Sequence, residues 1–113
     1  MNKFNNVENL KKYKHIHMIG IGGISMSGVA EILHNWGIFV TGSDCTKSKI
    51  TDRLSSHGIF VAIGHDIALA SKADLIVYSA AIKQNDPELV AARNKNIDII
   101  ERADFVRIFN QSL

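Results

Sequence analysis

The sequence has little of several features that would set a chain apart from ordinary globular proteins. It contains a single cysteine, Cys45, so no disulfide can form within the chain, which is compatible with a reducing cytoplasm. No segment approaches the roughly 18–20 consecutive apolar residues of a membrane span. The amino terminus is rich in Asn and Lys and lacks the apolar region of a secretory signal. We therefore expect a cytoplasmic protein without a membrane partner.

The chain also lacks a large excess of positive or negative charge. The formal net charge is +2, and the basic residues are scattered apart from the cluster Lys11, Lys12 and Lys14. A nucleic-acid-binding protein normally carries a concentrated basic stripe with aromatic residues, so we expect no nucleic-acid partner. With 113 residues, 46% of them hydrophobic and 21% charged, the chain has the length and composition of one globular domain with a substantial core.

The most informative segment is glycine-rich and runs from residue 17 to residue 33. Residues 15–19 are apolar and of strand length, which predicts a strand that is buried on both faces. After three glycines the period changes to that of a helix. One helical face is formed by Met26, Val29, Ala30 and Leu33. The segment therefore predicts a strand, a tight turn and a helix.

This turn has the features of an anion site. Gly22 and Gly23 leave backbone N–H groups uncovered, and the helix that follows directs unpaired N–H groups and a partial positive charge to the same place. A diphosphate is the most natural ligand, although a turn that binds nothing is the alternative. The spacing from Gly20 is close to the dinucleotide pattern G-x-G-x-x-G, but Ser25 replaces its third glycine. Ser25 and Ser27 are expected either to cap the helix or to donate to phosphate oxygens.

The same segment excludes an ATP-binding P-loop. Gly23 and Gly28 have the glycine spacing of that motif, but Val29-Ala30 follows where Lys-Ser/Thr is required. No Gly-Lys-Ser/Thr loop occurs anywhere in the chain. We therefore expect the chain by itself to catalyse no ATP-dependent reaction.

Strand and helix patterns alternate along the rest of the chain. After a lead-in at residues 1–14, strands are predicted at 15–19, 38–43, 59–63, 75–78 and 97–100, with helical segments at 26–36, 49–57, 67–71, 87–95 and from 102. Gly37 is expected to end the first helix, Ser48 to cap the second, and Asp86-Pro87 to begin the fourth. Alternation at this pitch predicts an α/β fold: a Rossmann-like parallel five-stranded sheet of order 3-2-1-4-5 in a three-layer α/β/α arrangement.

In such a sheet the ligand lies outside the carboxyl ends of the strands. Asp44 ends the second strand, at the distance from the glycine turn that suits a ribose hydroxyl and hence NAD, or it only builds a turn. His65 and Ser79 follow the third and fourth strands and are either ligand contacts or structural residues. His17 lies inside the first strand and is expected to be a core histidine whose ring is hydrogen-bonded.

Residues 17–33, HMIGIGGISMSGVAEIL, resemble the amino-terminal signature of the UDP-N-acetylmuramate–L-alanine ligases, a family within the Mur ligases of peptidoglycan synthesis. The resemblance continues in the right order over nearly all of residues 15–107. The further matching segments are 40–44, 64–65, 73–82, 87–88 and 101–104. The departures are minor: Ser25 stands where many members carry Gly, and Asn85-Asp86 stands where Asp-Asn is usual.

The resemblance implies that the fold holds the UDP part of UDP-N-acetylmuramic acid instead of NAD. On this basis residues 22–27 take the diphosphate, Asp44 with Ser43 faces the uridine, His65 lies near the same nucleoside, and residues 79–80 close the other side. The implied substrate-binding residues are Gly22, Gly23, Ile24, Ser25, Met26, Ser27, Ser43, Asp44, His65, Ser79 and Ala80.

Full-length members of this family add L-alanine to the muramyl carboxylate with ATP and Mg²⁺, through an acyl phosphate. The resemblance therefore implies an amino-terminal UDP-binding domain at 15–113, with the central ATP-binding and carboxy-terminal domains absent, and no catalytic residue or metal ligand in this chain. Without the central domain, we expect Phe105, Ile108 and Phe109 of the last helix to pack poorly. Two alternatives remain: a Rossmann-type NAD- or nucleotide-binding regulatory module, and a related Mur-type ligase of muramyl peptide recycling.

Overall fold

The computed structural model of the protein describes residue 10 and residues 12–111. The elements, in chain order, are β1 (His15–Ile19), α2 (Ile24–Asn35), β2 (Phe39–Asp44), α3 (Lys49–Ser56), β3 (Phe60–Ile63), α4 (Ile67–Ala70), β4 (Leu75–Tyr78), α5 (Pro87–Asn94), β5 (Asp98–Glu101) and α6 (Arg102–Gln111). The predicted lead-in lies largely outside the described residues, but Leu10 and Tyr13 are buried in the core. Within the described chain, no helix is long and apolar enough to cross a bilayer.

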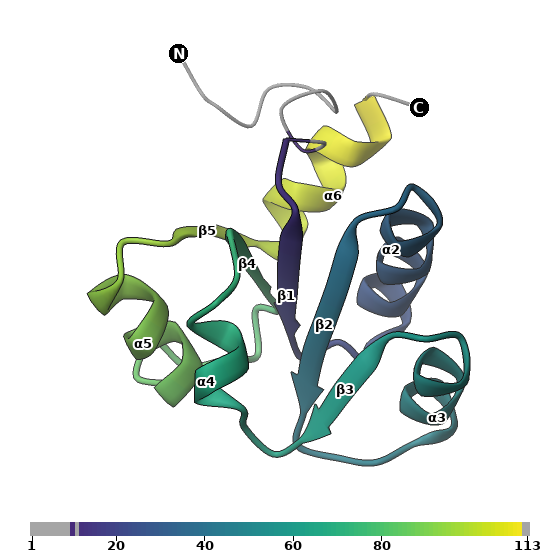
Figure 1. The fold of residues 1–113 in the computed structure, drawn as a ribbon, viewed down its shortest axis with the longest axis horizontal. Coiled ribbons are helices and arrows are strands. Elements are labelled where there is room, and N and C mark those ends of the chain that lie inside the picture. The colour runs from purple at the N-terminus through teal and green to yellow at the C-terminus, as the bar shows by residue number, and fades with distance from the viewer. Residues whose placement is uncertain (1–9, 11, 112–113) are drawn as a thin grey trace.

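The five strands form one parallel sheet of order β3-β2-β1-β4-β5 (Figure 1). The central strand β1 pairs with β2 on one side and β4 on the other, so that Ile16 lies opposite Val40 and Leu75. Because all the strands are parallel, their carboxyl ends lie at the same edge of the sheet. The predicted fold class and strand order are confirmed.

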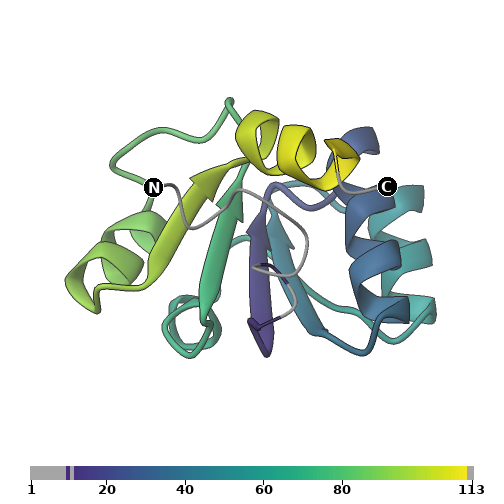
Figure 2. The same cartoon turned by 90° about the horizontal axis from the view of Figure 1, so that it is seen from above.

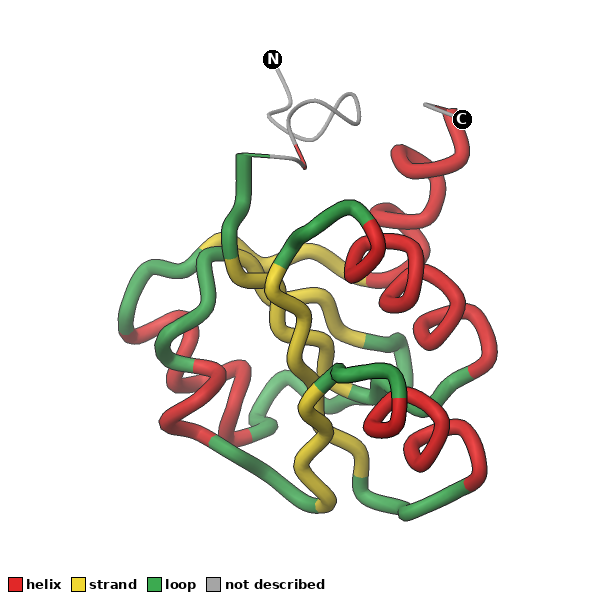
Figure 3. Tube along the Cα trace, turned by 45° about the vertical axis from the view of Figure 1, so that its right-hand side comes forward, coloured by secondary structure: helices red, strands yellow, loops and turns green. Residues whose placement is uncertain are grey.

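Helices cover both faces of the sheet (Figures 2 and 3). Alternate residues of β1 point to opposite faces, as the period of two requires. Ile16 and Met18 join the core cluster that contains buried side chains of α2, α3 and α6. Ile19 joins the second cluster, with buried side chains of α4 and α5. The sheet is thus the middle layer of an α/β/α arrangement, and β1 is buried along its whole length.

The last helix is well packed, which corrects one prediction. Phe105 and Ile108 are 0% and 2% exposed and belong to the same core cluster as Ile16, Leu75 and Val77. The expectation of poor packing is wrong for these two residues, because the sheet itself supplies the apolar surface that they cover. The side chain of Phe109 lies outside the described part of the chain.

The three helix-end residues predicted from the sequence, Gly37, Ser48 and Asp86, lie where they were expected, although α2 begins two residues earlier than predicted, at Ile24. The side chain of Ser48 accepts a hydrogen bond from Thr51 N–H and forms a capping box, and Asp86 caps α5 ahead of its N1 proline. Gly37 follows α2 with a φ of +90°, a conformation that favours glycine because it has no Cβ. These caps fix where each connection begins, and hence which residues reach the carboxyl edge of the sheet.

Candidate functional site

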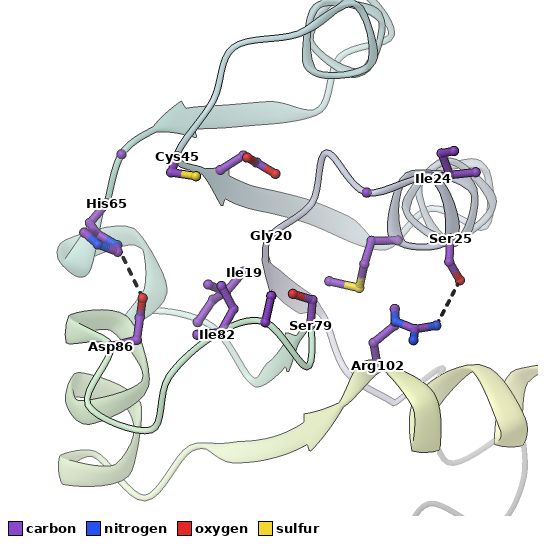
Figure 4. A pocket seen from close by; sticks show the side chains of 15 residues that line it. Ile19, Gly20, Ile24, Ser25, Cys45, His65, Ser79, Ile82, Asp86 and Arg102 are labelled. Carbon is purple, nitrogen blue, oxygen red and sulfur yellow. Dashed lines mark hydrogen bonds and ion pairs between the residues drawn. The ribbon is translucent and has the colours of Figure 1, made fainter.

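A cavity of about 490 Å³ opens at the carboxyl edge of the sheet. It lies beside the central strand β1, from which the chain builds the sheet first towards β2 and β3 and then, on the other side, towards β4 and β5. It is hereafter called the cleft, and its volume is in the usual range for small-molecule sites. Figure 4 shows side chains converging on it from the loops after β1, β2, β3 and β4 and from the start of α6. The lining residues are Ile19, Gly20, Gly23, Ile24, Ser25, Met26, Asp44, Cys45, Gly64, His65, Ser79, Ala81, Ile82, Asp86 and Arg102.

The amino terminus of α2 borders the cleft. Gly23 is the N-cap residue, and no side chain caps the helix. The first intrahelical hydrogen bond runs from Ser27 N–H to the Gly23 carbonyl at 2.8 Å, so the N–H groups of residues 24–26 precede the helical ladder. These amides, with the partial positive charge of the helix end, form an anion-binding surface. The alternative that Ser25 or Ser27 caps the helix is wrong.

Ser27 does not face this surface. It is 2% exposed, and its hydroxyl donates to the Ile24 carbonyl at 3.0 Å, within the first turn of α2. Its N–H is the one bonded to Gly23. A ligand at the helix end would therefore meet the backbone of residues 24–26 and the exposed side chain of Ser25.

Asp44 holds the loop at residues 20–23, hereafter called the glycine loop. One carboxylate oxygen accepts a hydrogen bond from Gly22 N–H at 2.9 Å, and the other accepts from Thr46 N–H at 3.1 Å. A Cβ at Gly22 would lie 2.7 Å from the carboxylate, so only glycine permits this approach. The geometry includes the backbone-bonding turn that was the alternative for Asp44, and the same side chain also lines the cleft.

A buried carboxylate, Glu88, lies beneath the cleft. It is 0% exposed and is located in the first turn of α5. One oxygen accepts from His17 Nε2 at 2.6 Å. The other accepts from Ser43 Oγ at 2.7 Å and from His65 Nδ1 at 2.9 Å. The network joins α5 to β1, β2 and the loop after β3.

The pKa values in this network follow from these contacts. Burial acts to raise the pKa of Glu88, but the hydrogen bonds from His17, His65 and Ser43 outweigh it and hold that pKa below its ordinary value. The hydrogen bond to Glu88 raises the pKa of His65, against a smaller effect of burial, and the charges of Asp86 and Glu88 add to the increase. The network therefore favours an ionised Glu88 and a protonated His65.

His17 is a core histidine, as predicted. It is 0% exposed, and its second ring nitrogen, Nδ1, lies 2.8 Å from Thr41 Oγ1. Both nitrogens are thus hydrogen-bonded inside the protein. Its role is to support Glu88 from the sheet.

Arg102 brings a second positive charge to the cleft. It begins α6, and its guanidinium lies 3.4 Å from Ser25 Oγ at the amino terminus of α2 (Figure 4). Arg102 belongs to the resembling segment 101–104 but is not among the residues that the resemblance assigns to the site. Nothing local in the sequence relates it to Ser25, which is 77 residues away.

The structure brings seven of the predicted site residues to the cleft and leaves four outside its lining. The seven are Gly23, Ile24, Ser25, Met26, Asp44, His65 and Ser79. The four are Gly22, which donates to Asp44, the buried Ser27, Ser43, which donates to Glu88, and the exposed Ala80. Their place in the lining is taken by Gly20, Cys45, Ala81, Ile82 and Arg102, among others.

Among the described residues, His65, Asp86 and Glu88 have the spacing of a metal site, with one ligand atom each within 4.8 Å of one another. The Glu88 oxygens, however, already accept three hydrogen bonds. His65 Nδ1 is itself the donor of one of them. The three residues thus belong to a hydrogen-bonded network in which the Glu88 carboxylate is already bonded to protein donors.

Comparison with known proteins identifies a family that matches most of the chain. Residues 15–111 match the family described as "Mur ligase family, catalytic domain". A UDP-N-acetylmuramate–L-alanine ligase of Clostridium botulinum (strain Okra / Type B1) is 52% identical over 95 residues, which are 84% of this chain and 21% of the relative. One of Methylibium petroleiphilum is 52% identical over 90 residues, 80% of this chain and 19% of that protein. The chain thus spans about a fifth of the length of the curated relatives that it matches.

Solved structures agree with the fold. The UDP-N-acetylmuramate–alanine ligase MurC of Thermotoga maritima matches with a TM-score of 0.82 and 32% identity, over 88% of this chain and 23% of that one. The UDP-N-acetylmuramate:L-alanyl-gamma-D-glutamyl-meso-diaminopimelate ligase of Neisseria meningitides matches with a TM-score of 0.71 and 35% identity, over 79% and 28%. In both cases the similarity covers a minor part of a longer enzyme.

Proposed function

The chain belongs to the Mur ligase family, and we propose that it is the amino-terminal domain that holds the UDP part of UDP-N-acetylmuramic acid in a UDP-N-acetylmuramate–L-alanine ligase. The observation that carries this proposal is the cleft itself, which gathers the helix end of α2, Asp44, His65 and Ser79 from four separate loops. The 52% identity to curated ligases of this name over 95 residues supports it. The proposed setting is cytoplasmic peptidoglycan synthesis.

The charges of the cleft suit a diphosphate. The guanidinium of Arg102 lies 3.4 Å from the hydroxyl of Ser25, in the same turn as the amides of residues 24–26, so an anion bound there would be in contact with donors from both α2 and α6. The nucleoside would extend towards Asp44 and His65, at the ends of β2 and β3. His65 and Asp86 are polar groups that can orient a base or ribose there.

Other substrates of the proposed reaction would bind elsewhere. An ATP–Mg²⁺ site needs a Gly-Lys-Ser/Thr loop, which the chain does not contain, and the carboxylates of Asp44 and Glu88 already accept hydrogen bonds from the protein. We therefore infer that ATP, Mg²⁺ and L-alanine are handled by parts of the longer enzyme that this chain does not match. This chain would contribute substrate binding and orientation.

A second candidate is a ligase of muramyl peptide recycling, favoured by the 35% identity to the Neisseria enzyme. The name of that enzyme also begins with UDP-N-acetylmuramate. The two candidates therefore differ in the group that is added and not in the ligand of this domain. The choice between L-alanine and a peptide by the longer protein would separate them.

Titration calorimetry tests the proposal with UDP-N-acetylmuramic acid, UDP and NAD as ligands. We expect the UDP compounds to bind more tightly than NAD, with modest affinity because no neighbouring domain closes over the sugar. Tighter binding of NAD would favour a dinucleotide-binding module and contradict the proposal.

One variant tests whether the ligand binds at the amino terminus of α2. Ile24 is 85% exposed at the first position of α2, so Ile24→Glu puts a carboxylate at the amides that we assign to the diphosphate. The helix dipole favours this charge, so the fold should keep its stability while the affinity falls about tenfold or more. Ile32→Glu, on the same helix, is the matched control and should bind as the wild type does. Equal affinities for both variants would place the ligand elsewhere.

A further inference from the structure

Glu88 is the most enclosed acidic side chain in the described chain, and no ligand can reach it directly. Its side chain is 0% exposed, and it accepts hydrogen bonds from His17, Ser43 and His65. A carboxylate buried with three donors is ionised and acts only as an acceptor. His65 Nδ1 must therefore carry the proton in the bond of 2.9 Å between them.

This hydrogen bond determines which ring nitrogen of His65 is available in the cleft. The contacts of His65 with Glu88 and with Asp86 both involve Nδ1, the latter at 3.8 Å. The side chain is 47% exposed and lines the cleft. With Nδ1 held against α5, Nε2 is the ring nitrogen available to a ligand. A neutral imidazole would offer an acceptor there, whereas a protonated one offers a donor.

We propose that Glu88 is a positioning residue of the cleft, which holds His65 through Nδ1 so that this histidine presents Nε2–H to an acceptor oxygen of the bound UDP-sugar. The proposal rests on the proposed function for the identity of the ligand. Glu88 is itself held from the sheet by His17 and Ser43, on β1 and β2. Its orientation is thus set before a ligand arrives, as pre-organisation requires.

The charges around His65 agree with a donor at Nε2. Asp86 and Glu88, both from the start of α5, face Nδ1, and His17 lies on the far side of Glu88. The other charged or titratable side chains that line the cleft are Asp44, Cys45 and Arg102. The two nearest charges are negative and favour the imidazolium.

The experiment is a pH series of affinities for UDP-N-acetylmuramic acid between pH 5.5 and 8.5. The diphosphate and carboxylate groups of this ligand keep their charge over the range, so a change in affinity reports on the protein. In the wild type, the affinity should decrease about tenfold as the pH rises through the pKa of His65. In Glu88→Gln the side chain keeps its shape but loses its charge. The midpoint of the profile should then move down by about one pH unit, while the affinity at pH 5.5 changes little.

Three controls make the result specific. His65→Ala should abolish the pH dependence, and adding Glu88→Gln to it should not change the profile further. Glu31→Gln makes the same chemical change on α2, at a carboxylate that pairs with Arg53, and should leave the profile as in the wild type. If Glu88→Gln does not fold, NMR titration of His65 in the wild type replaces it: the ligand should raise the pKa of this imidazole.

The outcomes separate the two proposals. A Glu88→Gln profile that is weakened equally at every pH, with its midpoint unchanged, would reduce Glu88 to a structural residue and overturn the inference. A His65 titration that the ligand does not alter would do the same. Failure of the wild type to bind UDP-N-acetylmuramic acid at any pH would instead contradict the proposed function, and this inference with it.

Discussion

The carboxylate of Asp44 and the backbone N–H of Gly22 are joined by a hydrogen bond of 2.9 Å that ties the end of β2 to the glycine loop after β1. The side chain that would face the nucleoside is therefore also the one that shapes the loop beside the diphosphate. Structure and binding are coupled at Asp44, and a substitution there should affect both.

We expect Asp44→Ala to lower the free energy of unfolding by about 1–3 kcal/mol, because the N–H groups of Gly22 and Thr46 both lose their acceptor. Affinity for UDP-N-acetylmuramic acid should fall about tenfold. Asp44→Asn keeps one acceptor oxygen and should be intermediate. Urea unfolding and calorimetry measure the two effects. Asp52→Ala removes an exposed carboxylate on α3 and should change neither the stability nor the affinity. Unaltered stability in Asp44→Ala would contradict the role that we assign to Asp44.

Two glycines should respond oppositely to alanine. A Cβ at Gly42 would lie 2.5 Å from Ile21 Cδ1 and 2.8 Å from the Met18 carbonyl, so Gly42→Ala should destabilise the fold by about 3 kcal/mol or more. Gly28 is exposed on α2 with nothing within 4 Å of such an atom. Gly28→Ala should therefore stabilise the protein by about 0.5–1 kcal/mol. Thermal unfolding tests both, and a stable Gly42→Ala protein would mean that Ile21 does not lie against β2 as described.

Arg102→Ala should weaken binding of the UDP-sugar about tenfold or more, because a charge-assisted hydrogen bond contributes about 1.5–3 kcal/mol. The loss should diminish at high salt, where the attraction of the wild-type guanidinium is screened. Arg107→Ala is the control: this arginine is on the same helix but pairs with Asp104 outside the cleft. Calorimetry at low and high ionic strength provides the comparison. Equal affinities for the two variants would remove Arg102 from the site.

Acid should weaken the fold through Glu88. Because the pKa of this carboxyl is lower in the folded protein than its ordinary value of 4.5, its contribution is present above pH 4.5 and is lost as the pH falls through the folded pKa. Glu88→Gln should be less stable than the wild type near pH 7, by about 3 kcal/mol, because it breaks a buried charged network. The difference should narrow below pH 4.5. Urea unfolding at several pH values measures it, and a constant difference would show that Glu88 does not titrate as described.

Much of the architecture could be predicted because its causes are local. Ser48 and Asp86-Pro87 mark helix starts through bonds that span two or three residues, and the length and apolar character of residues 15–19 mark a buried strand. Alternation of the elements then determines a parallel sheet and its order. The glycine loop and the helix after it identify the anion-binding end of the cleft from one continuous segment.

The remaining features depend on pairs that the chain separates widely. Glu88 belongs to the resembling segment 87–88, but nothing local in the sequence relates it to its partners, which lie 23, 45 and 71 residues away. Ser43 was expected to face a ligand, but the side of the sheet to which a strand residue points is set by its register, and here that side is occupied by Glu88.

The sequence by itself therefore determined the elements, their order and the end of the cleft that suits a phosphate, since each follows from interactions within a few residues. Only the tertiary structure decided which polar groups bond to one another at that edge. Strand order brings the middle of β1, the end of β2 and the loop after β3 against the start of α5, and a buried carboxylate is stable there only because donors from these three segments surround it.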